Sequence, residues 1–176
     1  MSVSAHLTPE PERRLWLILE SMRQGVESAD WKIAGLTAFA ALQLAIVKLV
    51  FAAGMTGLLA VVTLTAALPV GVLAFAPLTR LPKWLTFLEP SHDKIRADDC
   101  LIAAEDIIKY SHGELIFKLD KYLGGGITAT PYYEDVVGEI LANAKTAVRK
   151  RRLLRGVCAL VGAGEFALLA QLFLQR

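Results

Sequence analysis

The sequence predicts an all-α membrane protein with three transmembrane helices, in which a hairpin of two spans and a C-terminal third span flank a helical cytoplasmic region. The first observation is composition: 55% of the 176 residues are hydrophobic, whereas soluble domains have an apolar fraction nearer ~45–50%. The second is the segment Ile33–Pro77, in which Lys48 is the only charged residue. The third is a further apolar segment, Leu153–Leu174, which follows a cluster of arginines. Segments of this length and composition are typical of membrane spans.

The segment Ile33–Pro77 is too long for one span. As a straight helix it would measure ~68 Å at ~1.5 Å per residue, whereas a bilayer core is ~30 Å thick and takes ~20 residues. The chain must therefore fold back, and AAGMTG, from Ala52 to Gly57, is the predicted turn. We expect spans at Ile33–Ala53 and Thr56–Pro77. Two adjoining segments of spanning length argue against a soluble core, and the late, long first segment argues against a cleaved signal peptide.

Basic residues predict the orientation of the spans, because loops rich in Lys and Arg stay in the cytoplasm. Lys and Arg are frequent before the first span and between the second and third, whereas the hairpin turn has none and only Arg176 follows the third. We expect a cytoplasmic N-terminus and middle segment, with the C-terminus outside. Trp31 and Trp84 fall at the expected inner interface. The predicted parts are an N-terminal amphipathic helix in 1–31, the hairpin 32–77, a cytoplasmic sensor region 78–152 and the third span 153–176.

Two cytoplasmic segments have the apolar spacing of amphipathic helices. Each starts with a Thr-Pro pair, Thr8-Pro9 or Thr130-Pro131, in which threonine suits the N-cap and proline the first helical position. No breaker separates the second segment from the third span, so the two are expected to form one long helix. The apolar stripes either pack within one bundle or pair between subunits. They comprise Leu15, Leu19, Met22 and Val26 in the first segment, and Val137, Leu141, Ala144 and Val148 in the second.

Residues 93–123, between these segments, predict one or two further helices. Gly113 either breaks this run or is tolerated within it. The two cysteines lie far apart in unlike surroundings and are expected to be free thiols, as in a reducing compartment. The carboxylates near the start of the region are expected to form a solvated acidic face: Asp98, Asp99, Glu105 and Asp106.

Residues that carry catalytic chemistry are sparse. None of the three histidines, His6, His92 and His112, lies at metal-ligand spacing with a cysteine or another histidine. The sequence has no Walker lysine, dinucleotide fingerprint or nucleophile elbow. We therefore expect a protein that is not an enzyme and has no metal or cofactor. A net charge of only +2 does not indicate a nucleic-acid partner.

The segment KYLGGGITATPYY, from Lys121 to Tyr133, is a candidate for an anion or nucleotide site. Its glycines allow close approach of backbone N–H groups, and the following helix N-terminus favours negative charge. Tyrosines here, including Tyr122, are suited to stacking on a base. The alternative is a flexible connector capped by Thr130. The candidate ligand-binding residues are Lys118, Lys121, Gly124, Gly125, Gly126, Thr128, Thr130, Tyr132 and Tyr133.

Four polar residues lie within the predicted spans: Gln43, Lys48, Glu165 and Gln171. Counted from the cytoplasmic ends at ~1.5 Å per residue, Glu165 lies ~18 Å deep, between Gln43 at ~15 Å and Lys48 at ~22 Å. A charge facing lipid at this depth costs at least ~2.5–3.5 kcal/mol, so Glu165 and Lys48 are expected to turn toward protein. The structural interpretation is an ion pair, or a protonated Glu165 hydrogen-bonded to Gln43. The functional one, slightly favoured, is that Glu165 lines or gates a path for water.

Three spans are few for an aqueous path, so a function that breaches the membrane implies a homo-oligomer. Small residues that permit close helix approach occur on the first and third spans. They serve contacts either between subunits or inside one subunit. These residues are Gly35, Ala38, Ala41, Gly162 and Gly164.

Two parts of the chain carry a family resemblance. The first is ADWKIAGLTAFAALQLAI, with Asp30 and Lys32 at the entry to the first span. The second is GELIFKLDKYLGGG followed by PYYEDVVGEILANAKTAVRKRRLLRGV, in which a helix runs through a basic cluster into the last span. Together they resemble the Pycsar transmembrane effector family of bacterial antiphage defence. The order of elements matches over most of the chain, and the part between Glu89 and His112 matches least.

The resemblance implies a role in abortive infection. Such effectors stand beside a pyrimidine cyclase, whose product, cyclic CMP or cyclic UMP, activates the effector to impair the bacterial inner membrane. It thus implies a cyclic pyrimidine nucleotide as the ligand and membrane lipid as a partner, although the chain has no recognisable cyclic-nucleotide-binding domain. The alternatives are a constitutive small channel or transporter subunit, in which Lys48 and Glu165 belong to an ion pathway, and a membrane-anchored adaptor without conductance.

Overall fold

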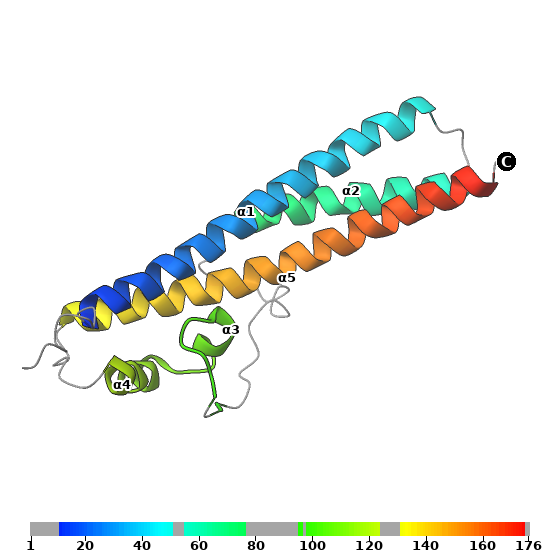
Figure 1. Ribbon diagram of the computed structural model, residues 1–176. Helices are drawn as coiled ribbons and strands as arrows, with labels where there is room; N and C mark the ends of the chain where they lie inside the picture. The colour runs from blue at the N-terminus through cyan, green and yellow to red at the C-terminus, as the bar shows by residue number, and fades with distance from the viewer. Residues whose placement is uncertain (1–10, 51–54, 77–94, 97, 124–130, 175–176) are drawn as a thin grey trace, which may run out of the picture. The chain divides into compact units, whose positions relative to one another are not determined.

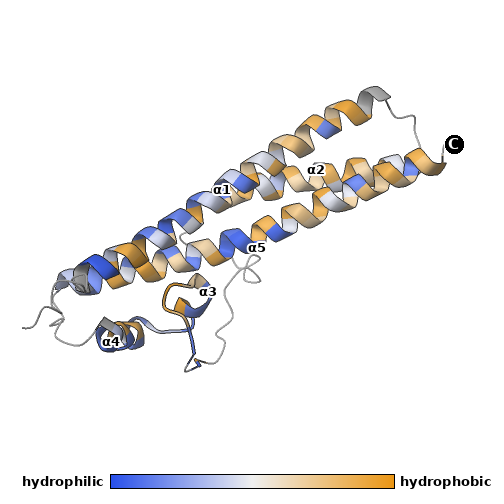
Figure 2. Ribbon diagram, viewed as in Figure 1, coloured by the Kyte–Doolittle hydropathy of each residue, from blue (hydrophilic) through white to orange (hydrophobic). Residues whose placement is uncertain are grey.

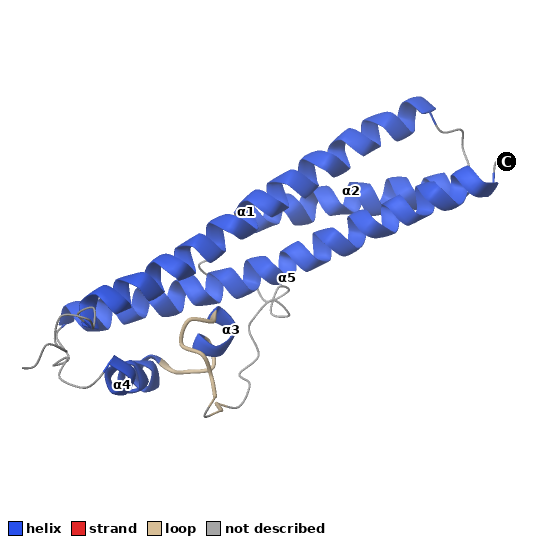
Figure 3. Cartoon of the chain, viewed as in Figure 1, coloured by secondary structure: helices blue, strands red, loops and turns tan. Residues whose placement is uncertain are grey.

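The computed structural model describes residues 11–50, 55–76, 95–96, 98–123 and 131–174, and helix is the only regular secondary structure in these ranges (Figure 3). Helices therefore supply the whole described framework. In chain order they are α1 (Pro11–Val50), α2 (Met55–Phe75), α3 (Ala104–Ile107), α4 (His112–Leu123) and α5 (Pro131–Leu174) (Figure 1).

Three of these helices, α1, α2 and α5, are long and apolar enough to cross a membrane, which confirms the predicted number of spans. Helix α2 matches the second predicted span closely. Helix α1 begins at Pro11 and runs to Val50 without a break, so the expected N-terminal helix and first span form one helix. Helix α5 likewise joins the helix that starts at Pro131 to the third span, as the lack of a breaker predicted. The predicted Thr8 and Thr130 caps and the start of the hairpin turn lie outside the described residues.

The chain divides into two compact units, and α1 and α5 each contribute a segment to both. Unit 1 comprises Met1–Val26 and Glu89–Arg149, and unit 2 comprises Glu27–Leu88 and Lys150–Arg176. All described residues of α3 and α4 belong to unit 1, and all of α2 belongs to unit 2.

Unit 1 is held together by the two predicted apolar stripes. Leu19 of α1 and Val137 of α5 are fully buried in one core with Leu115 and Leu119 of α4. Ile107 of α3 closes the same core. The side chains of both stripes are thus packed into a core within one chain. This favours packing within a bundle over pairing between subunits.

Helix α4 begins with a capping box that the sequence analysis missed. The Ser111 backbone N–H and hydroxyl both donate to Glu114 Oε2, at 2.9 and 2.7 Å, while the Glu114 N–H points back to Ser111 Oγ at 3.4 Å. These two hydrogen bonds from Ser111 lower the pKa of the Glu114 carboxyl. The reciprocal bonds satisfy N–H groups that a helix start leaves without partners. Gly113 is therefore tolerated in the first turn of α4 and does not break it.

Unit 2 packs the later part of α1 against α2 and the later part of α5. Ala40 of α1, Leu64 of α2 and Val157 of α5 share one core in which all three are fully buried. Close approach depends on glycine: a Cβ added at Gly164 would lie 2.8 Å from Leu64 Cγ, and one added at Gly71 would lie 2.1 Å from Thr37 Oγ1. The helices are therefore joined through small residues, as is usual in membranes.

The outer surface of unit 2 is apolar. Figure 2 shows hydrophobic residues dominating α2 and the C-terminal half of α5. Only 28% of the most apolar window of α2 is buried within the chain. Large apolar side chains such as Leu58, Val72 and Phe166 are exposed. A surface of this kind is stable in contact with lipid, so the chain is a membrane protein.

Candidate functional site

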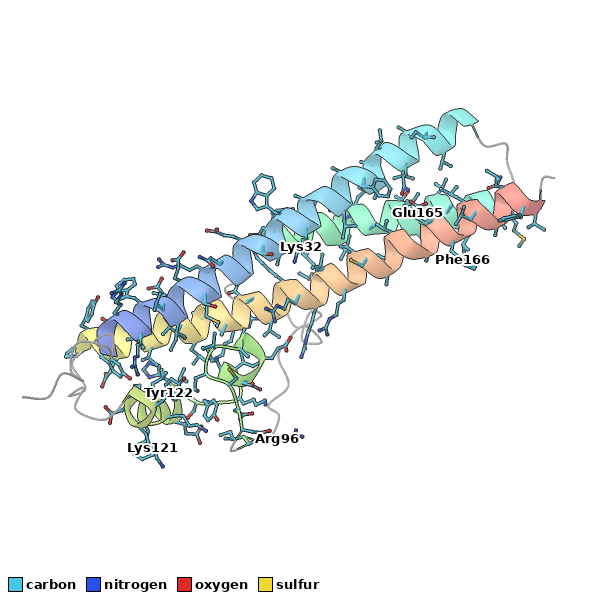
Figure 4. The ribbon with its side chains drawn as sticks, viewed as in Figure 1. Lys32, Arg96, Lys121, Tyr122, Glu165 and Phe166 are labelled. Carbon is cyan, nitrogen blue, oxygen red and sulfur yellow. The ribbon has the colours of Figure 1, made fainter. Side chains whose placement is uncertain are left out.

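Polar residues inside unit 2 point into the helix packing. Gln171 of α5 is 1% exposed, and its amide lies so close to Gly57 of α2 that an added Cβ would meet Oε1 at 2.6 Å. Glu165 and Phe166 leave α5 on opposite sides, with Glu165 toward the other helices and Phe166 away from them (Figure 4). Phe166 is 77% exposed. Glu165 thus faces protein, as expected for an ionisable group at membrane depth.

Two of these polar groups each have a buried oxygen without a hydrogen-bond partner among the described residues. Within the described part of the chain, neither Oε1 of Glu165 nor Oε1 of Gln43 has a hydrogen-bond partner, although both atoms are buried. A hydrogen bond between Glu165 and Gln43 is therefore not made through these two oxygens. Lys48 lies in α1, but its side chain is outside the described residues.

An ion pair joins α1 to α5 near the start of the apolar segments of unit 2. Lys150 Nζ donates to both carboxylate oxygens of Asp30, at 2.5 and 2.6 Å. The side chains are 16% and 30% exposed. Ile33 and Leu153, one turn along each helix, are buried in a shared core. The pair therefore fixes the register of α1 against α5 where the apolar segments begin.

The predicted solvated acidic face is wrong for Asp99, whose side chain is only 3% exposed. Lys109 Nζ donates to Asp99 Oδ1 at 2.7 Å and to Asp106 Oδ1 at 2.6 Å, and the Tyr110 hydroxyl donates to Asp99 Oδ2 at 3.0 Å. The hydrogen bond from Lys109, with one from the Arg96 backbone N–H, lowers the Asp99 pKa to about 2. This network holds the segment before α3 against Asp106 of that helix and against the residues just after it. Its donors replace the water that an exposed carboxylate would bind.

The residues predicted to bind a ligand have different surroundings. Lys118 donates to the Tyr110 hydroxyl at 3.0 Å, and its ammonium lies 5.2 Å from the centre of the same ring. Tyr133 is buried, at 4% exposure, and burial raises its pKa. Lys121 and Tyr132 are exposed. The remaining predicted residues lie outside the described part of the chain: Gly124, Gly125, Gly126, Thr128 and Thr130.

Unit 1 has a cleft that the sequence analysis did not identify, which we call the Arg14 cleft. It measures about 380 Å³ and is lined by Arg14, Leu17, Ile18, Ile102 and Tyr122. These residues come from α1, from the segment before α3, and from α4, so no local sequence pattern unites them. A cation, an aromatic ring and apolar walls are suited to an anionic ligand that carries a ring.

Unit 2 has a second cleft, the Trp31 cleft, of about 350 Å³. It is lined by Glu27, Asp30, Trp31, Ala34 and Phe75. Two carboxylates in its wall disfavour an anion. Within the described residues no group of three His, Cys, Asp or Glu side chains is placed to hold a metal ion.

Comparison with known proteins identifies the family. The sequence model of the Pycsar effector protein domain matches residues 14–175, a range that includes α2, α3, α4 and α5 and all but the first turn of α1. No curated protein and no solved structure matches the chain. The matched domain spans both compact units and the apolar helices, so it accounts for the membrane part as well as for unit 1. The chain belongs to the Pycsar effector family, and it is a membrane protein of bacterial antiphage defence.

Proposed function

We propose that this protein is the membrane effector of a cyclic-nucleotide antiphage system. A cyclic pyrimidine nucleotide, cyclic CMP or cyclic UMP, activates it, and it then impairs the inner membrane, so that the infected cell stops growing before phage mature. The observation that carries the proposal is the match of one effector domain to residues 14–175, in a chain with three helices able to span a membrane. Its action is ligand-gated and not enzymatic.

The polar groups in unit 2 supply the membrane step of this proposal. Burying a polar atom without a partner costs about 1–3 kcal/mol, and the Oε1 atoms of both Gln43 and Glu165 are buried in this way. If the helices separate, water can hydrogen-bond to these atoms and remove this cost. Activation therefore admits water to the interior of unit 2, and Glu165 lines the path that the water takes.

An aqueous path needs more than one copy of the chain, because three helices packed on a shared core leave no room between them. Gly35, Ala38 and Ala41 on α1, and Gly162 on α5, are exposed, and the two glycines have nothing within 4 Å of an added Cβ. They remain available for contacts between copies, whereas Gly164 is used inside the chain. The proposed active form is a homo-oligomer with unit 1 in the cytoplasm and the C-terminus outside.

A cell-based experiment tests the proposal. The chain is expressed in bacteria with an inducible pyrimidine cyclase, and membrane potential and dye entry are followed after induction. We expect depolarisation only when both proteins are present. Controls are cells with either protein alone and cells with a catalytically inactive cyclase. Depolarisation by the chain alone would indicate a constitutive channel, and an unaffected membrane with both proteins present would contradict the effector function.

Glu165 is tested by substitution in the same cells. Glu165→Gln is expected to insert normally and to lose or alter the depolarisation, because the amide has the size of the carboxylate without its charge. Phe166→Leu, at the adjacent lipid-facing position, is the matched control and should act like the unsubstituted protein. Combining Lys48→Glu with Glu165→Lys should restore part of the activity. Full activity in Glu165→Leu would show that the carboxylate has no functional role.

A further inference from the structure

We propose that the activating cyclic pyrimidine nucleotide binds in the Arg14 cleft of unit 1, with its phosphodiester on Arg14 and its base on Tyr122. The inference rests on the proposed function, which supplies the ligand class, and it assigns a site to a chain without a recognisable nucleotide-binding domain. Among the described residues, the site shares only Tyr122 with the glycine-containing segment that the sequence analysis considered.

The size and walls of the cleft suit one mononucleotide. Its volume of about 380 Å³ lies within the ~300–1,000 Å³ range of small-molecule sites. Leu17 and Ile18 of α1 form one apolar wall, and Ile102 contributes from the segment before α3. Leu17 and Ile102 are more than half exposed, at 60% and 52%. A ligand that covers them gains apolar burial, which a free inorganic phosphate cannot provide.

Charge selects an anion in this cleft. Among the described residues that line it, Arg14 carries a charge and none is a carboxylate. Arg14 is half-buried, and in the part of the chain that the structure describes no ion pair or hydrogen bond engages its guanidinium. Two other cations of unit 1 already have partners, since Arg23 pairs with Glu139 and Lys109 pairs with Asp99. A planar guanidinium forms paired hydrogen bonds with phosphate oxygens, so Arg14 is placed to hold the cyclic phosphodiester.

Tyr122 provides the stacking surface. Its side chain is 58% exposed, and it leaves α4 on the side opposite Lys121 (Figure 4). Every nucleobase has a π-face that stacks on an aromatic side chain. The Trp31 cleft also has aromatic residues, but its wall contains Glu27, which would repel the phosphodiester, and Asp30, which is already paired with Lys150. The combination of ring and cation therefore favours the Arg14 cleft.

Calorimetry on the full chain in detergent tests the assignment with cyclic CMP and cyclic UMP as probes. Arg14→Gln and Tyr122→Leu are each expected to weaken binding about tenfold or more, while Tyr122→Phe, which keeps the ring, retains most of the affinity. The matched controls are Arg13→Gln, beside Arg14 and exposed, and Tyr132→Leu, with a ring that is 55% exposed. Both controls should bind like the unsubstituted chain, and circular dichroism checks that every variant is folded.

The outcomes separate the site from the function. Binding to the unsubstituted chain with unchanged affinity in Arg14→Gln and Tyr122→Leu would overturn the cleft assignment and leave the proposed function standing. Equal losses in the variants and in their matched controls would also overturn the assignment. No binding of either nucleotide to the unsubstituted, folded chain would overturn direct activation and the site together.

Discussion

The packing of α2 against α5 makes a quantitative prediction at Gly164. A Cβ at this position would lie 2.8 Å from Leu64 Cγ, 3.0 Å from Leu64 Cδ2 and 3.2 Å from Thr63 Oγ1. Gly162, two residues earlier on the same helix, has nothing within 4 Å of an added Cβ. The pair Gly164→Ala and Gly162→Ala therefore compares the same chemical change with and without a clash.

The expected difference in unfolding free energy follows from these distances. Replacing glycine by alanine within a helix stabilises it by roughly 0.5–1 kcal/mol, and this gain is common to both variants. Overpacking costs about 1–3 kcal/mol and applies only at Gly164. We expect Gly164→Ala to be less stable than Gly162→Ala by about 1–3 kcal/mol, measured by reversible unfolding in mixed detergent micelles with circular dichroism.

A second variant shows whether the contact is the cause. Leu64 is fully buried, so Leu64→Ala alone should cost about 2–5 kcal/mol. It also removes the atoms nearest to the new methyl group, so Gly164→Ala should cost at least ~1 kcal/mol less in that background than alone. Equal stability of Gly164→Ala and Gly162→Ala would refute the close packing of α2 against α5.

Three further predictions concern stability. The folded pKa of Asp99, about 2, lies below its ordinary 3.8, so its contribution to stability is complete above about pH 4 and is lost as the pH falls toward 2. In Asp99→Asn the melting temperature should therefore depend less on pH over that range. A pH dependence of the melting temperature equal to that of the unsubstituted chain would contradict this. Leu119→Ala, at a site 1% exposed, should cost about 2–5 kcal/mol in chemical unfolding, whereas Phe117→Ala, at 73% exposed, should stay within ~0.5 kcal/mol; equal losses would contradict the core described for unit 1. Lys150→Met should lower stability by about 1 kcal/mol, and adding Asp30→Asn should restore part of the lost stability. A double variant less stable than Lys150→Met alone would show that the pair does not hold α1 to α5.

The long helices were predictable because their signals are local. Hydrophobic length defined α2 from Thr56 onward, and the spacing of Val137, Leu141 and Ala144 predicted the buried face of α5. Spacing did not show that the predicted N-terminal helix and the first span join into the single helix α1. Nothing in the sequence around Trp31 stops a helix, and the structure continues through it.

The buried charges were not predictable from local pattern. Asp99 was assigned to a solvated face because its neighbours in sequence are acidic, but its partners Lys109 and Tyr110 lie ten and eleven residues later. The Ser111–Glu114 capping box was visible in the sequence as Ser-x-x-Glu and was overlooked beside Gly113.

The Arg14 cleft shows the limit of sequence analysis for the site. Its residues come from three separate segments, and Arg14 and Tyr122 are 108 positions apart in the chain. Small residues show the same limit: Gly164 is buried against Leu64, whereas Gly162 is exposed. Composition identified both as suited to close contact, but the rotation of α5 about its axis decides which one makes it.

The most direct test of the central claim is ion and dye release from sealed liposomes that contain only the purified chain. Cyclic CMP and cyclic UMP are added outside, after selection for liposomes in which unit 1 faces outward, with cyclic AMP and protein-free liposomes as controls. We expect little release before addition, release after a cyclic pyrimidine nucleotide is added, and a reduced response in Glu165→Gln. Release that is the same with and without nucleotide, or no release at any nucleotide concentration from correctly inserted protein, would contradict the central claim.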